Sequence, residues 1–169
     1  MKYTSAEAAK ILRQLYDDQR ALLHMEAQSM DFLAAVGEDI ESVRPVYDFA
    51  ETQKKLTEYE EKIRIIKHAI NVFNSTHIVP EFDMTIDQML IYIPQLSQRK
   101  EKLYMMKSKL PKARETSSYS SRGNIIDYRI ANYDIEAAEK DYAEVSALLA
   151  KAQTALDVVN NSETMEIDI

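Results

Sequence analysis

The sequence has no cysteine, and only two glycines and four prolines among its 169 residues. Without cysteine the chain can form no disulfide and no thiolate metal site, and it has no cysteine nucleophile. Two glycines cannot build the glycine-rich loops with which dinucleotide-binding and Walker-type proteins hold phosphate groups. The same scarcity leaves few turns, so it favours long helices.

Signals for membrane insertion or secretion are also missing. No apolar run approaches the roughly eighteen residues of a membrane span. The first residues, MKYTSAEAAK, contain no apolar segment of signal-peptide length. These absences predict a soluble cytoplasmic protein without membrane contact.

Common catalytic motifs are absent as well. None of the three histidines, His24, His68 and His77, follows a glutamate by three residues, and no His-Glu-x-x-His occurs. The ligand patterns of di-iron bundles and metalloproteases are therefore missing. We expect no catalytic residues, no cofactor, no metal site and no enzymatic activity.

Hydrophobic residues, by contrast, make up 46% of the chain. In four segments, 5–36, 49–73, 86–110 and 135–159, they recur in steps of three and four residues, as on one face of a helix. This spacing predicts a mainly α fold, an elongated bundle of four long antiparallel helices with coiled-coil-like packing. The bundle forms a single domain over residues 1–160, and the acidic tail 161–169 is expected to be a loose end.

The second and fourth predicted helices have the most regular apolar stripes. Their stripe residues are Phe49, Thr52, Leu56, Tyr59, Ile63, Ile66, Ile70 and Phe73, then Ile135, Ala138, Tyr142, Val145, Leu149, Ala152, Leu156 and Val159. The other two stripes are Ala8, Ile11, Leu15, Leu22, Met25, Phe32 and Val36, then Ile86, Leu90, Ile93, Leu96, Leu103, Met106 and Leu110. We expect the first helix to end at Gly37 and the third to continue through Pro94 with a kink.

Polar residues mark where these helices begin. Thr4 with Glu7, and Thr85 with Gln88, have the spacing of capping boxes. Asp134 can cap the fourth helix. Before it, residues 113–131 combine turn residues with the β-branched and aromatic run IIDYRIA, which predicts a short β-hairpin.

The stretch FNSTHIVPEFDMTIDQ, residues 73–88, gathers the side chains that most resemble an active site. It can be a catalytic loop using His77 and Glu81, or only the connection where one helix ends and the next begins. Asn, Ser and Thr residues commonly end helices, while acidic residues and Thr commonly begin them. Two ligands alone make a poor metal site. The connection is the preferred interpretation.

Positive charge is concentrated in one stretch of an otherwise acidic chain. The net charge is −7, yet residues 98–122 hold eight Lys or Arg against two Glu. These cations can face acidic protein surface, which we favour, or they can contact phosphate groups or RNA, with Tyr104 and Tyr119 available for stacking. The candidate contact residues are Lys107, Lys109, Lys112, Arg114 and Arg122. Because the net charge is negative, no general nucleic-acid binding is expected.

Two segments carry a family resemblance. INVFN (residues 70–74) ends a long helix before a loop and a helix begun by Thr85. RIANYDIEAAEKDYAEVSALLAKAQTALDVVN (residues 129–160) contains the final predicted helix after a short strand. From about residue 45 onward the sequence resembles a small bacterial family of unknown function, some of whose members are labelled septicolysin. The resemblance implies a mostly helical fold that self-assembles, and Asn71 and Asn74 are motif residues, expected to form hydrogen bonds or end the helix. Ile93 and Pro94 depart from the family pattern.

We therefore expect a self-assembling structural or interaction module that forms a homo-oligomer. Apolar residues on second flanks of the first and third helices predict the contact surface. These residues are Leu12, Leu23, Met30 and Leu33, and then Met89, Ile91 and Met105. Two alternatives remain, a pore-forming or membrane-active septicolysin-like protein and a phosphate or RNA contact through residues 98–122.

Overall fold

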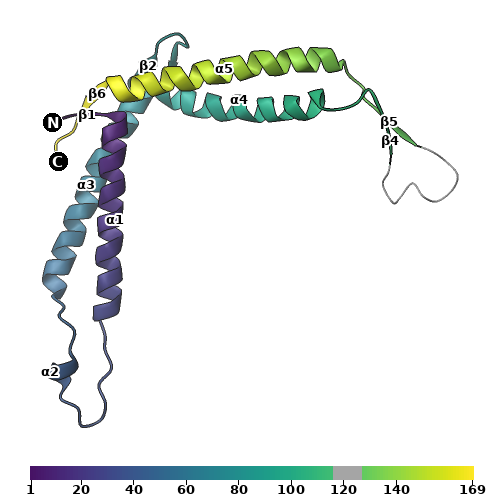
Figure 1. Cartoon of the computed structure of the whole chain (residues 1–169). Helices are drawn as coiled ribbons and strands as arrows, with labels where there is room; N and C mark the ends of the chain where they lie inside the picture. Colours follow the sequence, from purple (N-terminus) through teal and green to yellow (C-terminus); the bar gives the residue numbers. More distant parts are fainter. Residues whose placement is uncertain (116–126) are drawn as a thin grey trace. The chain divides into compact units, whose positions relative to one another are not determined.

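The computed structural model describes residues 1–115 and 127–169, and these are mainly helical (Figure 1). The helices are α1 (Ser5–Ser29), α2 (Ile40–Val43), α3 (Phe49–Thr76), α4 (Ile86–Lys107) and α5 (Ile135–Ser162). Short strands pair antiparallel as β1 (Lys2–Thr4) with β6 (Thr164–Glu166), β2 (Ile78–Val79) with β3 (Met84–Thr85), and β4 (Lys112–Arg114) with β5 (Tyr128–Ile130).

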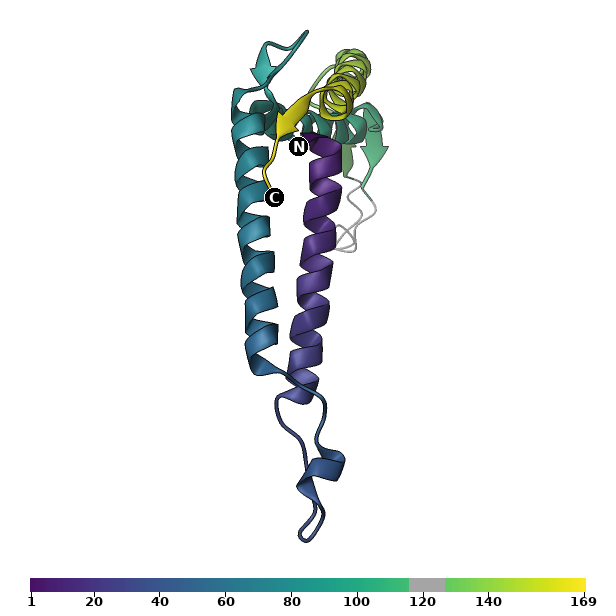
Figure 2. The ribbon, with the colours of Figure 1, turned by 90° about the vertical axis from the view of Figure 1, so that its left-hand side faces the viewer.

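These elements form two compact units. Unit 1 comprises residues 1–77 and 158–169, and unit 2 comprises residues 78–157. Within unit 1, α1 and α3 lie side by side and antiparallel (Figure 2). Within unit 2, α4 and α5 pack antiparallel (Figure 1). The predicted set of four long antiparallel helices is therefore confirmed, as two helical hairpins, whereas a single domain over residues 1–160 stays a prediction.

The core of unit 1 follows the predicted stripe of α3. Five of its eight positions are buried, and Phe49, in the first turn, is mostly exposed. The buried ones are Thr52, Leu56, Ile63, Ile66 and Phe73. In contrast, α1, all of whose residues the structure describes, fully buries only Ala8.

The first helix is shorter than predicted. It ends at Ser29, where the Met30 N–H donates to the Glu26 carbonyl, and not at Gly37. Gly37 instead lies in a turn with φ of 89°, a conformation that suits glycine. Phe32 keeps helical spacing in the sequence but lies outside the helix, under the Arg44 guanidinium at 5.4 Å from its ring centre. In this segment the contacts made within the connection, such as that of Phe32 with Arg44, outweigh the helix propensity of the residues.

The expectation of a loose tail at residues 161–169 was wrong. Strand β6 pairs with β1, with Met165 opposite Tyr3. Met165 and Ile167 are 7% and 3% exposed. The Ile167 N–H donates to the Met1 carbonyl at 2.9 Å, and the Met1 ammonium donates to the Ile167 carbonyl at 2.9 Å. Apolar Met165 and Ile167 alternate with acidic residues, which is the period of a strand. The tail therefore buries these two apolar side chains in unit 1 and exposes its acidic ones.

In unit 2 the stripe of α5 is confirmed and that of α4 is corrected. The buried residues are Ala138, Val145, Leu149, Ala152 and Leu156 on α5, and Ile86, Met89, Leu96 and Leu103 on α4. Met89 is fully buried, whereas Leu90 and Leu110, both predicted in the stripe, are 48% and 66% exposed. After Ile86 the next buried residue is therefore Met89, three residues later, and not the predicted Leu90. As predicted, α4 continues through Pro94.

The predicted caps and hairpin are present. Both capping boxes form, with Thr4 accepting from the Glu7 N–H and Thr85 from the Gln88 N–H. The Asp134 carboxylate accepts from two N–H groups at the start of α5. Strands β4 and β5 form the predicted hairpin between α4 and α5, whose middle, residues 116–126, lies outside the described part of the chain.

Candidate functional site

The stretch 73–88 is built as a connection between helices. The hydroxyl groups of Ser75 and Thr76 both donate to the Val72 carbonyl in the last turn of α3, at 3.0 and 2.8 Å. Strands β2 and β3 then form a tight hairpin, and Thr85 caps α4. These polar side chains form hydrogen bonds with backbone groups at the end of α3 and the start of α4. This is the role predicted for them as a connection between helices.

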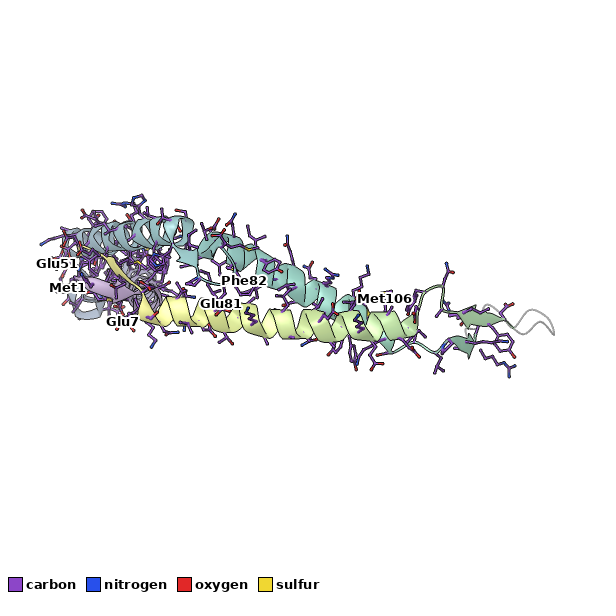
Figure 3. All side chains as sticks on the ribbon, turned by 90° about the horizontal axis from the view of Figure 1, so that it is seen from above. Met1, Glu7, Glu51, Glu81, Phe82 and Met106 are labelled. Carbon is purple, nitrogen blue, oxygen red and sulfur yellow. The ribbon has the colours of Figure 1, made fainter. Side chains whose placement is uncertain are left out.

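His77 and Glu81 have separate partners. The His77 ring stacks on Phe73 with centroids 4.4 Å apart, and its Nε2 lies 3.5 Å from Glu163. The carboxylate of Glu81, which is labelled in Figure 3, lies 3.0 Å from the Lys151 ammonium. No group of three His, Cys, Asp or Glu side chains within residues 1–115 and 127–169 could hold a metal ion. The contacts of Glu163 and Lys151 were not visible in the sequence, since both lie far along the chain.

The motif residues of the family resemblance have structural positions. Thr85 is the N-cap of α4. Asn71 is exposed on α3. Asn74 Oδ1 is buried but accepts no hydrogen bond from the described residues, so the hydrogen bond expected of this atom is not observed.

Two of the predicted contact cations lie against aromatic rings of unit 2. The Lys107 ammonium lies 4.3 Å from the centre of the Tyr142 ring, and the Lys112 ammonium 4.2 Å from that of Tyr128. Tyr104 packs beside Tyr142, with ring centroids 6.0 Å apart. Such cation–π contacts stabilise a lysine locally and compete with an external anion for it.

The other candidates in this stretch are placed differently. Lys109 lines a groove described below, and Arg114 is exposed on β4. Arg122 and Tyr119 lie outside the described residues. The anion-contact hypothesis therefore stays a prediction.

A groove of about 660 Å³ lies between the end of α4 and the β4–β5 hairpin. Apolar side chains form much of its wall, and three of them, Met105, Leu110 and Ile130, are 56%, 66% and 71% exposed. The described residues that line it include Lys102, Lys109 and Arg129 but no acidic residue. We call this site the basic groove. It combines apolar surface with positive charge.

Local contacts hold the walls of the basic groove in place. The Tyr133 hydroxyl donates a hydrogen bond of 2.7 Å to the carbonyl of Met106, the residue labelled in Figure 3. This bond links the chain after β5 to the last turn of α4. The Ala131 N–H donates to the Pro111 carbonyl at 3.1 Å. Arg129 forms an ion pair with Glu115 across the hairpin.

A second apolar surface lies in the connection between α1 and α3, which contains α2 (Figure 1). Within residues 30–43, Leu33 and Val36 are 96% and 109% exposed, and Met30 and Ile40 are also largely exposed. The segment holds four acidic residues and no basic one. We call it the acidic tip.

Polar contacts hold the base of the acidic tip. The Glu26 carboxylate on α1 accepts from the Tyr47 hydroxyl and from the Gln53 amide, each at 2.7 Å. This hydrogen bond to Glu26 is the main reason that the pKa of Tyr47 is raised, because it stabilises the protonated phenol. Arg44 pairs with Glu41 at 2.8 Å just beyond α2. The connection is thus ordered by polar side chains while its apolar ones face outward.

None of the helices in the described part of the chain is both long enough and apolar enough to span a bilayer.

The fold is similar to that in a crystal structure of a functionally unknown conserved protein from Corynebacterium diphtheriae. The TM-score is 0.63 at 16% sequence identity, and the match covers 98% of this chain and 100% of that chain. At this identity the likeness shows the fold alone. No protein-family model and no curated protein matches the chain.

Proposed function

We propose that the protein is a self-assembling interaction module that works as a homo-oligomer. The observation that carries this proposal is the acidic tip, where Leu33 and Val36 are exposed almost completely. Large apolar side chains that stay exposed to water do not stabilise an ordered segment. Groups of exposed apolar residues commonly mark interfaces with other proteins.

The long helices support the same proposal. Of the flank residues predicted to make contacts between copies, Met89 is buried in unit 2 and Leu12 is half-buried. Leu23 on α1 and Ile91 and Met105 on α4 are exposed, whereas Met30 and Leu33 lie beyond the end of α1, in the acidic tip. Burial of about 800 Å² of such surface on each subunit is typical of a stable association.

The proposal extends to location and chemistry. The protein is cytoplasmic, which agrees with its cysteine-free composition. It catalyses no reaction, and the separate partners of His77 and Glu81 agree with that. Any activity found for the purified protein would contradict this part, and loss of that activity in a His77→Ala, Glu81→Ala variant would assign it to these two residues.

The septicolysin resemblance offers membrane activity as the alternative. The negative net charge and narrow apolar stripes favour the assembly module over it. Leakage of dye from anionic liposomes at micromolar protein would support the membrane-active function instead.

Light scattering coupled to size exclusion at micromolar concentration tests self-assembly. We expect a mass of at least twice the 19.5 kDa of one chain. A single species at 19.5 kDa would contradict the proposed function.

A further inference from the structure

The acidic tip and the basic groove are complementary in two respects. Each presents strongly exposed apolar side chains, Leu33 and Val36 on the tip and Met105 and Ile130 at the groove. A narrow loop that presents such side chains can insert them into a concave apolar site. Apolar contact can therefore supply affinity between them.

Charge determines which surface pairs with which. Arg44 pairs with Glu41, and Glu115 pairs with Arg129. Apart from these ion pairs, the tip holds the acidic residues Asp31, Glu38 and Asp39. The described lining of the groove holds Lys102 and Lys109 and no acidic residue. Contact of tip with tip, or of groove with groove, would bring like charges together. Contact of tip with groove brings opposite charges together, and such complementarity gives interfaces their specificity.

We infer that the acidic tip of one copy binds the basic groove of a second copy of this chain. Leu33 and Val36 then contact Met105 and Ile130, and the tip carboxylates lie near Lys102 and Lys109. The inference rests on the proposed self-assembly and specifies its surfaces. Two copies that exchange this contact reciprocally form a closed dimer, and repetition of it from copy to copy forms a larger ring or a filament.

Two variants separate the surfaces. The tip variant combines Leu33→Ser with Val36→Ser, and the groove variant combines Met105→Ser with Ile130→Ser. All four side chains are more than half exposed, so the fold should be unaffected, which circular dichroism checks. A matched control, Val72→Ser with Val158→Ser, removes two other exposed apolar side chains, 46% and 60% exposed.

Each variant alone should associate about a hundredfold or more weakly than the wild type, because two apolar contacts are lost at every junction. The control should assemble as the wild type does. When the tip and groove variants are mixed, one intact tip and one intact groove remain, so a 1:1 complex should form that neither variant forms alone. Light scattering gives its mass, and isotope-labelled copies analysed by native mass spectrometry give its composition.

Other outcomes overturn the inference in distinguishable ways. If both variants assemble like the wild type, self-assembly stands but uses other surfaces. If each variant is monomeric and a mixture of the two forms no 1:1 complex, the two surfaces do not bind one another. A monomeric wild type removes both the inference and the proposed function. A monomeric wild type that binds dodecanoate in the groove would make an anionic amphiphile the occupant in place of a second copy.

Salt gives an independent readout. If opposite charges steer the contact, wild-type association should weaken from 50 mM to 500 mM NaCl, because salt screens exposed charges. Association that is unchanged or stronger at high salt would contradict the charge pairing.

Discussion

The helical hairpin α1–α3 of unit 1 and the hairpin α4–α5 of unit 2 follow the same plan but bury their helices unequally. Within unit 2, the 28-residue helix α5 buries Ala138, Val145, Leu149, Ala152 and Leu156. The 25-residue helix α1 fully buries only Ala8, while Ile11, Leu15 and Leu22 are half-buried. Their connections differ as well, since β4 and β5 join α4 to α5 whereas the acidic tip joins α1 to α3.

The regularity of a stripe, more than its apolar content, accounts for this difference. The stripe of α5 has no interruption, and its alanines leave room for large neighbours to pack closely. Asp18 and Ser29 interrupt the stripe of α1, and Leu12 and Leu23 lie beside it. A wider, broken apolar face is less completely covered by one partner helix. The uncovered part of α1 is available to another surface.

The largest expected effect tests this contrast directly. Replacement of Leu149 by alanine should lower the free energy of unfolding by about 2–5 kcal/mol, because it opens a cavity at a buried position. Replacement of the half-buried Leu22 by alanine should cost only about 1 kcal/mol, because water already reaches that side chain. Denaturant unfolding in dilute protein, followed by circular dichroism, measures both. Equal losses would remove the contrast between α1 and α5.

The tail of unit 1 provides the next comparison. Ile167→Ala should lower the free energy of unfolding by about 2–3 kcal/mol, since its side chain is only 3% exposed. Ile169→Ala is the matched control, because Ile169 is 46% exposed and should cost less than about 0.5 kcal/mol. Thermal unfolding of the two variants side by side suffices. If Ile167→Ala is as stable as Ile169→Ala, the packing of the tail on unit 1 is unimportant for stability.

The capping boxes allow the same change in each unit. Thr4→Ala and Thr85→Ala should each destabilise the protein by about 1 kcal/mol, because each leaves helix N–H groups without an acceptor. Thr57→Ala, in the middle of α3, should be neutral or slightly stabilising, since its hydroxyl only binds the Gln53 carbonyl of the same helix. Urea denaturation compares the three. A loss at Thr57 equal to that at the caps would count against the capping role.

The smallest effect concerns the base of the acidic tip. The raised pKa of Tyr47 means that the folded state favours the protonated phenol, so this contribution to stability is complete below the ordinary tyrosine pKa of 10.0. It is lost as the pH rises through the raised folded-state pKa. Tyr47→Phe should therefore be slightly less stable at neutral pH and should lose less stability than the wild type at strongly alkaline pH. Melting temperatures measured across that range give both values, and parallel curves would contradict the assignment.

The sequence predicted elements whose signals are local. Alternating three- and four-residue steps located α3 and α5, and the spacing of Thr85 and Gln88 located the start of α4. Local signals failed where distant contacts decide the structure. Phe32 continues the apolar spacing of α1, yet its contact with Arg44 belongs to the connection.

The candidate surfaces were harder to predict than the helices. The basic groove joins the end of α4 to β5, segments separated by more than a dozen residues, so its Arg129 was not among the predicted contact residues. The count of charges identified Lys109 as a candidate contact residue. It did not show that Lys109 and its apolar neighbours form one surface. Exposure of Val36 could not be predicted either, because its position in the apolar stripe is typical of a buried helical residue, yet it is 109% exposed.

Unit 1 is discontinuous, and this affects the order in which the protein folds during synthesis. Its last part, residues 158–169, is translated after the whole of unit 2. Strand β1, made before unit 2, can pair with β6 only after residues 164–166 have left the ribosome. Because the helices of unit 2 contact one another over a continuous segment, they can fold while α1 and α3 still lack the strand that closes their unit. On the ribosome, the later-made unit should therefore mature before the earlier-made one.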